Sequence, residues 1–426
     1  MFFRRPIYSG DLNRTVALAA LAGAAMIAAC GQSGGSGPGS RPAVLIALNV
    51  PSSANAFLAA QIQHGADLAI AEQNAKAPTV GGVAIHLTEK VYDDNGQAQQ
   101  AASNVQSAVH DGAVAVIEDG AGAKISAPTS GSAGVPEIVI ANGDINLLDP
   151  QSRPSLFRLG IANDADASIL GAYMATKAKS AAILHDDTES GRDAAVQLRN
   201  ALSTAHVTIQ PVIEVASTAT TIDTQVQQLA NAKPGAIAIE GGDTFTGRAA
   251  AAIRAAGLTT PLFAGQFGEF PAVRATAGAA ADGLTFASSR LTSESDDQAF
   301  GNFERNLAKA GLGCTDAGVK TAAGAPVLQP DDYAMYAYDA VNLVVAALKK
   351  NGSTSPSAKL LSAMTSARVK SANADSRGFN PATREGISDD DIYLAVIHDN
   401  EFQPVKDEQL SATLPPIDQN LAGCAK

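Results

Sequence analysis

The chain has 426 residues, of which 46% are hydrophobic, 17% are charged and 5% are aromatic. This length exceeds what one hydrophobic core usually supports, so we expect about two domains. The net charge is −12, the sequence pI is about 4.9, and no basic run appears in the body of the chain. These values argue against nucleic acid as a partner and against electrostatic docking on anionic lipid.

The first 29 residues read as a signal peptide. Three arginines within the first 14 residues precede the apolar stretch Val16–Ala29, which is too short for a comfortable membrane span. Small residues then lead directly to Cys30, which resembles the lipobox of bacterial lipoproteins and implies lipidation of Cys30. An ordinary signal peptide with an incidental cysteine is the alternative. Residues 30–42 are Gly- and Ser-rich and read as a flexible tether.

Two cysteines remain if Cys30 carries a lipid. An even remainder in an exported protein suggests a disulfide between Cys314 and Cys424. Two buried free thiols are the alternative.

The first folded unit reads as a strand, a loop and a helix. Ala43–Leu48 is a continuous apolar run that predicts a strand buried on both faces. Pro51 ends the strand, and Ser52 or Ser53 can cap a helix whose apolar residues recur at helical spacing over Leu58–Ile70. In an open α/β sheet, such a strand-to-helix loop is a common site for small ligands.

Strands and helices then alternate. Strands are expected at Val83–Tyr92, Ala113–Ile117 and Val135–Ile140, and helices at Ala98–His110 and from Ser126. The pattern restarts with helices at Ser168–Lys177, Asp193–Ala205, Thr221–Ala232 and Thr246–Ala256, and strands at Ser180–Leu184, Val207–Val215, Ala236–Glu240, Pro261–Ala264 and Gly283–Ala287. Later helices are expected at Ser295–Ala310, Asp331–Lys350 and Ser357–Ala367, before a hairpin of Ile392–Ile397 and Phe402–Val405. This order predicts two α/β units with parallel sheets flanked by helices.

Short stretches along the chain resemble the type I periplasmic binding proteins, specifically the leucine/isoleucine/valine-binding branch of ABC-transporter substrate-binding proteins. The stretches that carry the resemblance are Gly65–Ala71, Val91–Asn95, Ala133–Pro136, Phe157–Arg158, Asp186–Thr188 with Gly191–Arg192, and Ala337–Val341.

The resemblance implies two Rossmann-like lobes joined by a three-crossover hinge. Lobe one would comprise residues 43–160 and 290–380, and lobe two residues 161–289 and 381–415, with a tail at 416–426. It also implies a monomeric, lipid-anchored protein of the bacterial envelope that closes on a small molecule and delivers it to an ABC permease. No cofactor is implied.

The resemblance also places the ligand site. In the amino-acid binders of the family, a Ser and a Thr meet the ligand carboxylate, an aromatic residue covers the ligand, and an acid in lobe two meets the ammonium group. The corresponding positions here are Gly122 or Ala123, the Asn142–Asp144 loop, Ser190, and Gln266 with Glu269 nearby. The full set of candidate ligand-binding residues is Ser52, Ser53, Phe57, Gly120, Gly122, Ala123, Asn142, Gly143, Asp144, Asp187, Ser190, Asp243, Phe245, Gln266, Phe267 and Glu269.

The missing hydroxyls disfavour a standard branched-chain amino acid. A polar ligand, neutral or cationic, would suit the acids Glu118, Asp119, Asp144, Asp187 and Asp243. Three phenylalanines at positions 57, 245 and 267 leave a hydrophobic or aromatic ligand open. Each candidate also has a structural alternative, since the serines and acids precede helices and can be caps, and the phenylalanines can be core.

Enzymatic motifs are not found. The six histidines are scattered without a metal-binding pair, and the G-x-S-x-G string at residues 31–35 lies in the tether, with no strand before it. Gly120-Ala121-Gly122 opens like a dinucleotide fingerprint, but Ile125 occupies the third glycine position. A ligand sensor with a signalling partner, and a structural envelope lipoprotein without a ligand, remain alternatives to a transport function.

Overall fold

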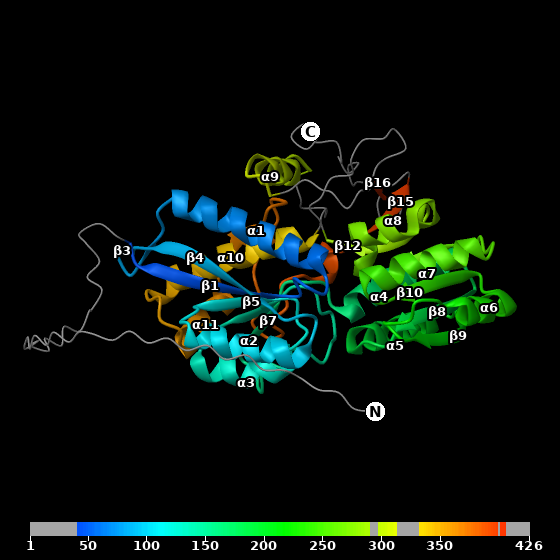
Figure 1. Cartoon of the computed structure of the whole chain (residues 1–426), viewed down its shortest axis with the longest axis horizontal. Helices are drawn as coiled ribbons and strands as arrows, with labels where there is room; N and C mark the ends of the chain where they lie inside the picture. The colour runs from blue at the N-terminus through cyan, green and yellow to red at the C-terminus, as the bar shows by residue number, and fades with distance from the viewer. Residues whose placement is uncertain (1–40, 290–296, 313–331, 399–400, 406–426) are drawn as a thin grey trace, which may run out of the picture. The chain divides into compact units, whose positions relative to one another are not determined.

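A computed structural model describes residues 41–289, 297–312, 332–398 and 401–405 (Figure 1). These residues belong to one compact unit, Arg41–Lys426. Cys30, Cys314 and Cys424 lie outside the described residues, as do the signal peptide, nearly all of the tether and the tail at 416–426. The lipidation and the disulfide therefore stay predictions.

The first sheet has five parallel strands in the order β4-β1-β5-β6-β7. Their bounds are β1 Ala43–Val50, β4 His86–Asp93, β5 Ala115–Glu118, β6 Glu137–Val139 and β7 Leu156–Arg158. The strand expected at Val83–Tyr92 is divided into the short β3 (Val83–Ala84), which pairs with β2 (Thr79–Val80), and β4.

Helices cover both faces of this sheet (Figure 1). Ile46 and Leu48 of β1 join the core cluster that includes Ile62 of helix α1 (Ala56–Ala75), whereas Ala47 joins the cluster that includes Val105 of helix α2 (Ala98–His110). This division follows from the period of two residues along a strand, which turns neighbouring side chains to opposite faces. The other helices of this part are α3 Ala123–Ala133, α10 Asp332–Asn351 and α11 Ala358–Ser366.

The longest helices of this part, α1 and α10, pack tightly against each other. Gly65 permits the contact, because a Cβ at that position would lie 2.0 Å from the backbone oxygen of Ala334. The late helical segment of the chain therefore returns to the first sheet.

The second sheet has seven strands in the order β16-β15-β12-β11-β10-β8-β9. Five of them are parallel: β8 Ser180–Asp186, β9 Thr208–Val215, β10 Ala236–Glu240, β11 Leu262–Ala264 and β12 Thr285–Ser288. The predicted C-terminal hairpin, β15 Tyr393–His398 and β16 Glu401–Pro404, is confirmed and joins β12 antiparallel. The chain passes between the sheets after β7, after β12 and before β15.

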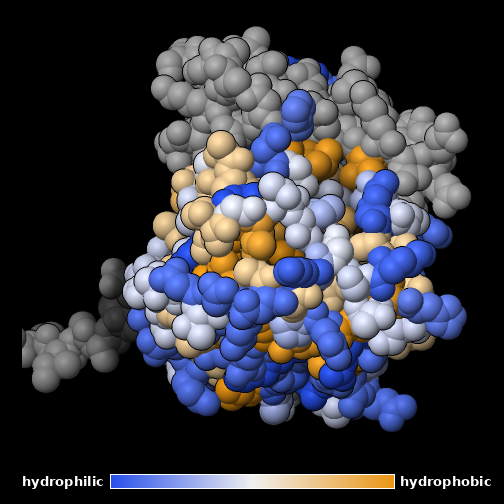
Figure 2. Space-filling model, turned by 90° about the vertical axis from the view of Figure 1, so that its right-hand side faces the viewer, coloured by the Kyte–Doolittle hydropathy of each residue, from blue (hydrophilic) through white to orange (hydrophobic). Residues whose placement is uncertain are grey.

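The helices of the second part largely match expectation. They are α4 Asn163–Lys177, α5 Glu189–Thr204, α6 Asp223–Ala232 and α7 Asp243–Ala255, with a further short helix α8 Pro271–Ala277. The remaining elements are helix α9 (Asp297–Lys309) and a separate pair of short strands, β13 (Val369–Lys370) and β14 (Ser376–Arg377). Figure 2 faces the end that carries the second sheet and shows hydrophilic side chains with smaller hydrophobic areas between them.

Helix starts are where sequence and structure differ most. The prediction that Ser52 or Ser53 caps α1 is wrong, because the cap is Asn55, whose side chain accepts a hydrogen bond from the Leu58 N–H. Helix α5 begins four residues earlier than expected, because Thr188 caps it by accepting from the Gly191 N–H at 3.0 Å. Among the helices of the described ranges, none has the length and hydropathy needed to cross a bilayer.

Candidate functional site

A cavity of about 390 Å³ lies between the carboxyl ends of the parallel strands of the two sheets. Loops after β1, β5 and β6 form one wall, and loops after β8, β10 and β11 form the other, together with the start of α4. Ligands of open α/β sheets bind at this edge. A second hollow, of about 780 Å³, is lined only by residues between 368 and 391, so it does not join the two sheets.

The cavity wall is strongly acidic. Six carboxylate side chains line it, and no Lys, Arg or His does so within the described residues; the six are Asp119, Asp166, Asp186, Glu189, Glu240 and Asp243. Within the same ranges, no group of three or more His, Cys, Asp or Glu side chains is arranged to hold a metal ion.

Asp186 holds two loops together. Its Oδ1 accepts hydrogen bonds from the backbone N–H of Thr188 at 3.1 Å and from the Thr188 hydroxyl at 2.5 Å. Its Oδ2 accepts from the Gly242 N–H at 2.8 Å, so β8 and the start of α7 are joined through this carboxylate. Both oxygens are therefore occupied by structural contacts.

Asp166 and Glu240 have fewer such contacts than Asp186. Asp166 Oδ2 accepts from the Gln266 N–H at 3.0 Å, whereas its Oδ1 is buried and has no hydrogen-bond partner among the described residues. Burial raises the pKa of Asp166 to about 7. The pKa of Glu240 is raised well above its ordinary value, first by burial and then by the charges of Asp166 and Asp186.

Gln266 has its side chain committed to the protein. Its Nε2 donates to the backbone oxygen of Ile161 at 3.1 Å, and its Oε1 accepts from the Tyr333 hydroxyl at 3.3 Å. The next residue, Phe267, lines the cavity and stacks on Tyr333 with ring centroids 6.0 Å apart.

The opposite wall carries a second acidic group at Asp119. Burial raises the pKa of this carboxyl to about 7, and the neighbouring charge of Asp94 adds to the effect. Behind it, Glu118 and Glu137 are fully buried, and burial raises the pKa of both. The serines at positions 126 and 130 donate hydrogen bonds to Glu137.

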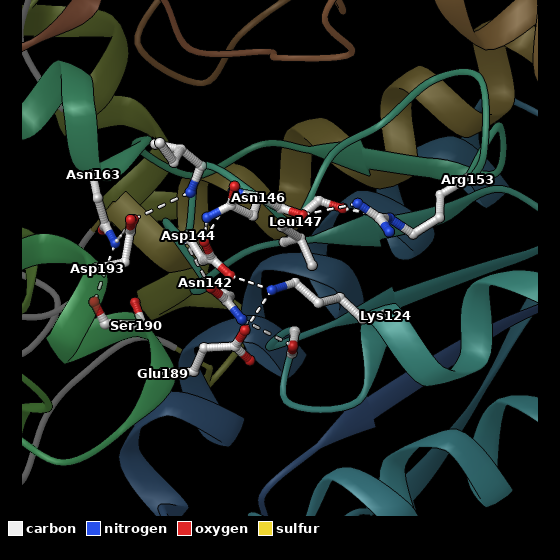
Figure 3. A network of polar contacts seen from close by, with 12 residues as sticks. Lys124, Asn142, Asp144, Asn146, Leu147, Arg153, Asn163, Glu189, Ser190 and Asp193 are labelled. Carbon is white, nitrogen blue, oxygen red and sulfur yellow. Dashed lines mark hydrogen bonds and ion pairs between the residues drawn. The ribbon is translucent and has the colours of Figure 1, made fainter. Parts of the chain in front are cut away.

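Polar contacts cross the cavity rim. Figure 3 shows Lys124 between Asp144 and Glu189, with its Nζ 2.5 Å from a carboxylate oxygen of each. Elsewhere along the rim, Asn55 Nδ2 donates to Asp243 Oδ2 at 3.2 Å. Burial raises the pKa of Asp243, while the hydrogen bonds from Thr244 and Asn55 lower it.

Five of the residues predicted from the sequence line the cavity: Asn142, Ser190, Asp243, Gln266 and Phe267. The others lie outside its wall: Ser52, Ser53, Phe57, Gly120, Gly122, Ala123, Gly143, Asp144, Asp187, Phe245 and Glu269.

Several of these outer residues have other contacts. The Ser53 hydroxyl donates to Asp93, Asp187 accepts from the Ser217 N–H, and Asp332 donates to Glu269 through its N–H. Phe245 is core, at 3% exposure. A Cβ at Gly122 would lie 2.6 Å from the Ala101 Cβ, so this glycine serves the contact between α2 and α3.

The structure adds cavity residues that the sequence did not single out, above all Asn55, Asp166 and Glu240. A signal for Glu240 exists in the sequence, because it is an acid at the carboxyl end of the apolar run Ala236–Glu240. Asp166 has no comparable signal, since its place beside Glu240 depends on how the start of α4 lies against the loop after β11.

Comparison with known proteins identifies the fold and the family. A family profile described as "Periplasmic binding protein" matches residues 44–400. The branched-chain amino acid transporter substrate-binding protein LivJ from Streptococcus pneumoniae, solved with isoleucine, is 18% identical with a TM-score of 0.70; the match covers 88% of this chain and 100% of LivJ. Comparison with the curated proteins gives no match.

Two further solved structures have the same fold. A solute-binding protein of an ABC transporter from R. palustris, in complex with benzoate, is 19% identical over 88% of this chain and 98% of its own, with a TM-score of 0.72. A solute-binding protein from Rhodopseudomonas palustris BisB5, in complex with 3,4-dihydroxybenzoic acid, is 22% identical over 84% and 95%, with a TM-score of 0.69. The chain thus belongs to the periplasmic binding proteins, a family of extracytoplasmic solute-binding proteins, and has their type I fold.

Proposed function

We propose that this protein captures a small solute in the cavity between its two sheets and delivers it to an ABC-type permease in the cytoplasmic membrane. The observation that carries the proposal is the cavity itself, whose walls come from strand ends of both sheets. A solute that contacts both walls favours the closed arrangement, which gives a permease a state to recognise.

Contacts across the cavity support closure as the binding mode. The Lys124–Glu189 ion pair crosses the cavity rim, and the Asn55–Asp243 hydrogen bond joins a residue of the first wall to a residue of the second. Hinge opening would break both contacts, and a bound solute would offset their loss by bridging the same walls. The residues proposed to contact the solute are Asn55, Asp119, Asn142, Ser190, Asp243, Gln266 and Phe267.

A standard branched-chain amino acid is disfavoured as the solute. Its α-carboxylate needs hydrogen-bond donors or a cation, and the described cavity wall contains no basic side chain. The side-chain amide of Asn142 donates to the backbone oxygen of Gly120, and that of Asn163 donates to Ser190 and Asp193. By contrast, isoleucine, benzoate and 3,4-dihydroxybenzoic acid, the ligands of the similar structures, all carry a carboxyl group.

The envelope location rests on the N-terminus. We place the lipid on Cys30, with residues 31–42 as the tether of a monomeric body. Mass spectrometry of the mature protein tests the lipid, and unreduced peptides test the bond between Cys314 and Cys424. A mature chain that begins elsewhere than at Cys30 would remove the anchor from the proposal.

Solute binding is tested by thermal unfolding of the purified protein against amino acids, amides, amines, polyols and aromatic acids. A solute at a hundred times its Kd should stabilise the folded protein by about 2.7 kcal/mol. Asn55→Ala and Asp243→Asn should reduce that gain, whereas Asp223→Asn, at an exposed position of α6, should leave it unchanged. If no solute stabilises the protein, or if both cavity variants respond as the parent does, the proposed site is wrong.

A further inference from the structure

Two carboxylates in the cavity wall lack the partners that buried charges normally have. Asp166, near the start of α4, is 5% exposed, and Glu240, at the end of β10, is 4% exposed. Asp166 Oδ1 has no hydrogen-bond partner, and no donor among the described residues contacts the Glu240 carboxylate. A buried carboxylate without a donor or a cation is costly, so it points to a group that is supplied from outside the chain.

Gly265 shows how close the two carboxylates are. A Cβ built on Gly265 would lie 2.7 Å from Glu240 Oε2 and 2.8 Å from Asp166 Oδ2, so the two oxygens are separated by at most the sum of these distances, 5.5 Å. An ammonium nitrogen makes hydrogen bonds of about 2.7–2.9 Å to carboxylate oxygens and can therefore bridge two oxygens at such a separation. Any larger residue at position 265 would fill part of this space.

The acidic surroundings of the two carboxylates also favour an ammonium group. Asp186 adds a third carboxyl group to this end of the cavity, and no cationic side chain is among the described lining residues. The same wall gives a ligand carboxylate no charged partner, as described above. Leu58 and Phe267 are the largest apolar side chains of the lining, and they suit a hydrocarbon body.

We propose that the solute is a primary amine without a carboxylate, whose ammonium group binds between Asp166 and Glu240 and whose apolar body contacts Leu58 and Phe267. This inference rests on the proposed function of the cavity as the solute site. It assigns the cation-binding role to Glu240 and Asp166 and gives Gln266 a positioning role, because the Gln266 N–H holds Asp166 Oδ2.

The test compares solutes that share one hydrocarbon skeleton. Leucine carries both charged groups, 3-methylbutylamine lacks the carboxylate, and 4-methylpentanoate lacks the amine. Benzylamine and benzoate form a second pair with one carbon skeleton, and 1,4-diaminobutane adds a linear amine. Isothermal titration calorimetry on the purified protein should show at least tenfold tighter binding of an amine than of its matched acid and of leucine.

Each result has a separate meaning. Binding of leucine, benzoate or 4-methylpentanoate that equals or exceeds that of every amine would overturn the amine assignment and leave the cavity as a solute site. If neither these probes nor the wider solute panel binds, both the amine assignment and the proposed function fall.

Variants then locate the ammonium group. Asp166→Asn and Glu240→Gln keep the side-chain shape and should each weaken amine binding at least tenfold, while Asp223→Asn at an exposed position of α6 should not change it. Gly265→Ala should also weaken amine binding, because its methyl group occupies the space beside both carboxylates. Unfolding curves of the empty variants confirm that each is folded. Amine binding that survives both neutral substitutions at parental strength would refute the assignment.

Discussion

Replacing Asp166 with asparagine tests whether the empty cavity stores an unfavourable buried charge. Burial raises the pKa of Asp166 from its ordinary value of 3.8 to about 7. The stabilising contribution of this group is therefore fully present below roughly pH 4, and it is lost as the pH rises through about 7, because only the unfolded chain ionises easily in that window. At about 1.36 kcal/mol per pKa unit, the loss reaches about 4 kcal/mol above pH 7 and about 2 kcal/mol at pH 5.

The Asp166→Asn protein cannot ionise at this position and should escape that loss. Its side-chain oxygen can still accept the hydrogen bond from the Gln266 N–H. Urea unfolding should show a gain of up to about 4 kcal/mol at pH 8 and about half of that at pH 5, in solutions without amine. A gain that is equal at the two pH values, or a loss at pH 8, would contradict the reasoning. Asp223→Asn, which is exposed, should change stability by less than about 0.5 kcal/mol at either pH.

Three further substitutions test contacts that frame the site. Lys124→Met leaves Asp144, whose side chain is 2% exposed, without its cation and should cost about 2–4 kcal/mol in urea unfolding. Gly65→Ala places a methyl group against the backbone oxygen of Ala334 and should cost about 1–3 kcal/mol in thermal unfolding, because α1 and α10 must separate. Arg158→Lys loses a forked contact from a side chain that is 1% exposed and should cost about 3 kcal/mol, measured by urea unfolding.

Each of these has a matched control on the surface. Lys90→Met breaks an exposed ion pair and should cost less than about 1 kcal/mol. Ala71→Ser changes an exposed position of α1, and Arg192→Lys alters an exposed pair with Glu214, so both should have effects under about 1 kcal/mol. If any control costs as much as its buried counterpart, burial is not the cause of the effect.

Much of the fold is predictable from local patterns. Continuous apolar runs such as Ala236–Glu240 mark strands that are buried on both faces, and α2 matches its predicted bounds, Ala98–His110. Prediction failed where an element was very short or where the residue that caps a helix was not the expected one. Strand β7 has three residues, and the start of α1 depends on Asn55, which forms its cap two residues beyond the serines that looked suitable.

The candidate site was predictable only as a region. Loops at the carboxyl ends of parallel strands were expected to hold the ligand, and the cavity lies there. Some residues carried over from the family motifs line the cavity, and others make contacts behind its wall. A motif position predicts the loop in which a residue lies, but it does not predict where the side chain points. Gln266 shows this well, since it lines the cavity while its amide contacts Ile161 and Tyr333.

The sequence by itself determined the two α/β units and the acidic charge, and it showed that the loops expected to hold the ligand lack the hydroxyls of the family's amino-acid binders. Only the tertiary structure decided which acids share the cavity. Asp166 and Glu240 are 74 positions apart in the chain, and no local pattern couples them. They meet because the start of α4 lies against the loop after β11, where the Gln266 N–H donates to Asp166 Oδ2, and because Gly265 has no side chain to fill the space beside both carboxylates. The cost of burying both carboxylates follows from that meeting, and so does the cation that we propose to offset it.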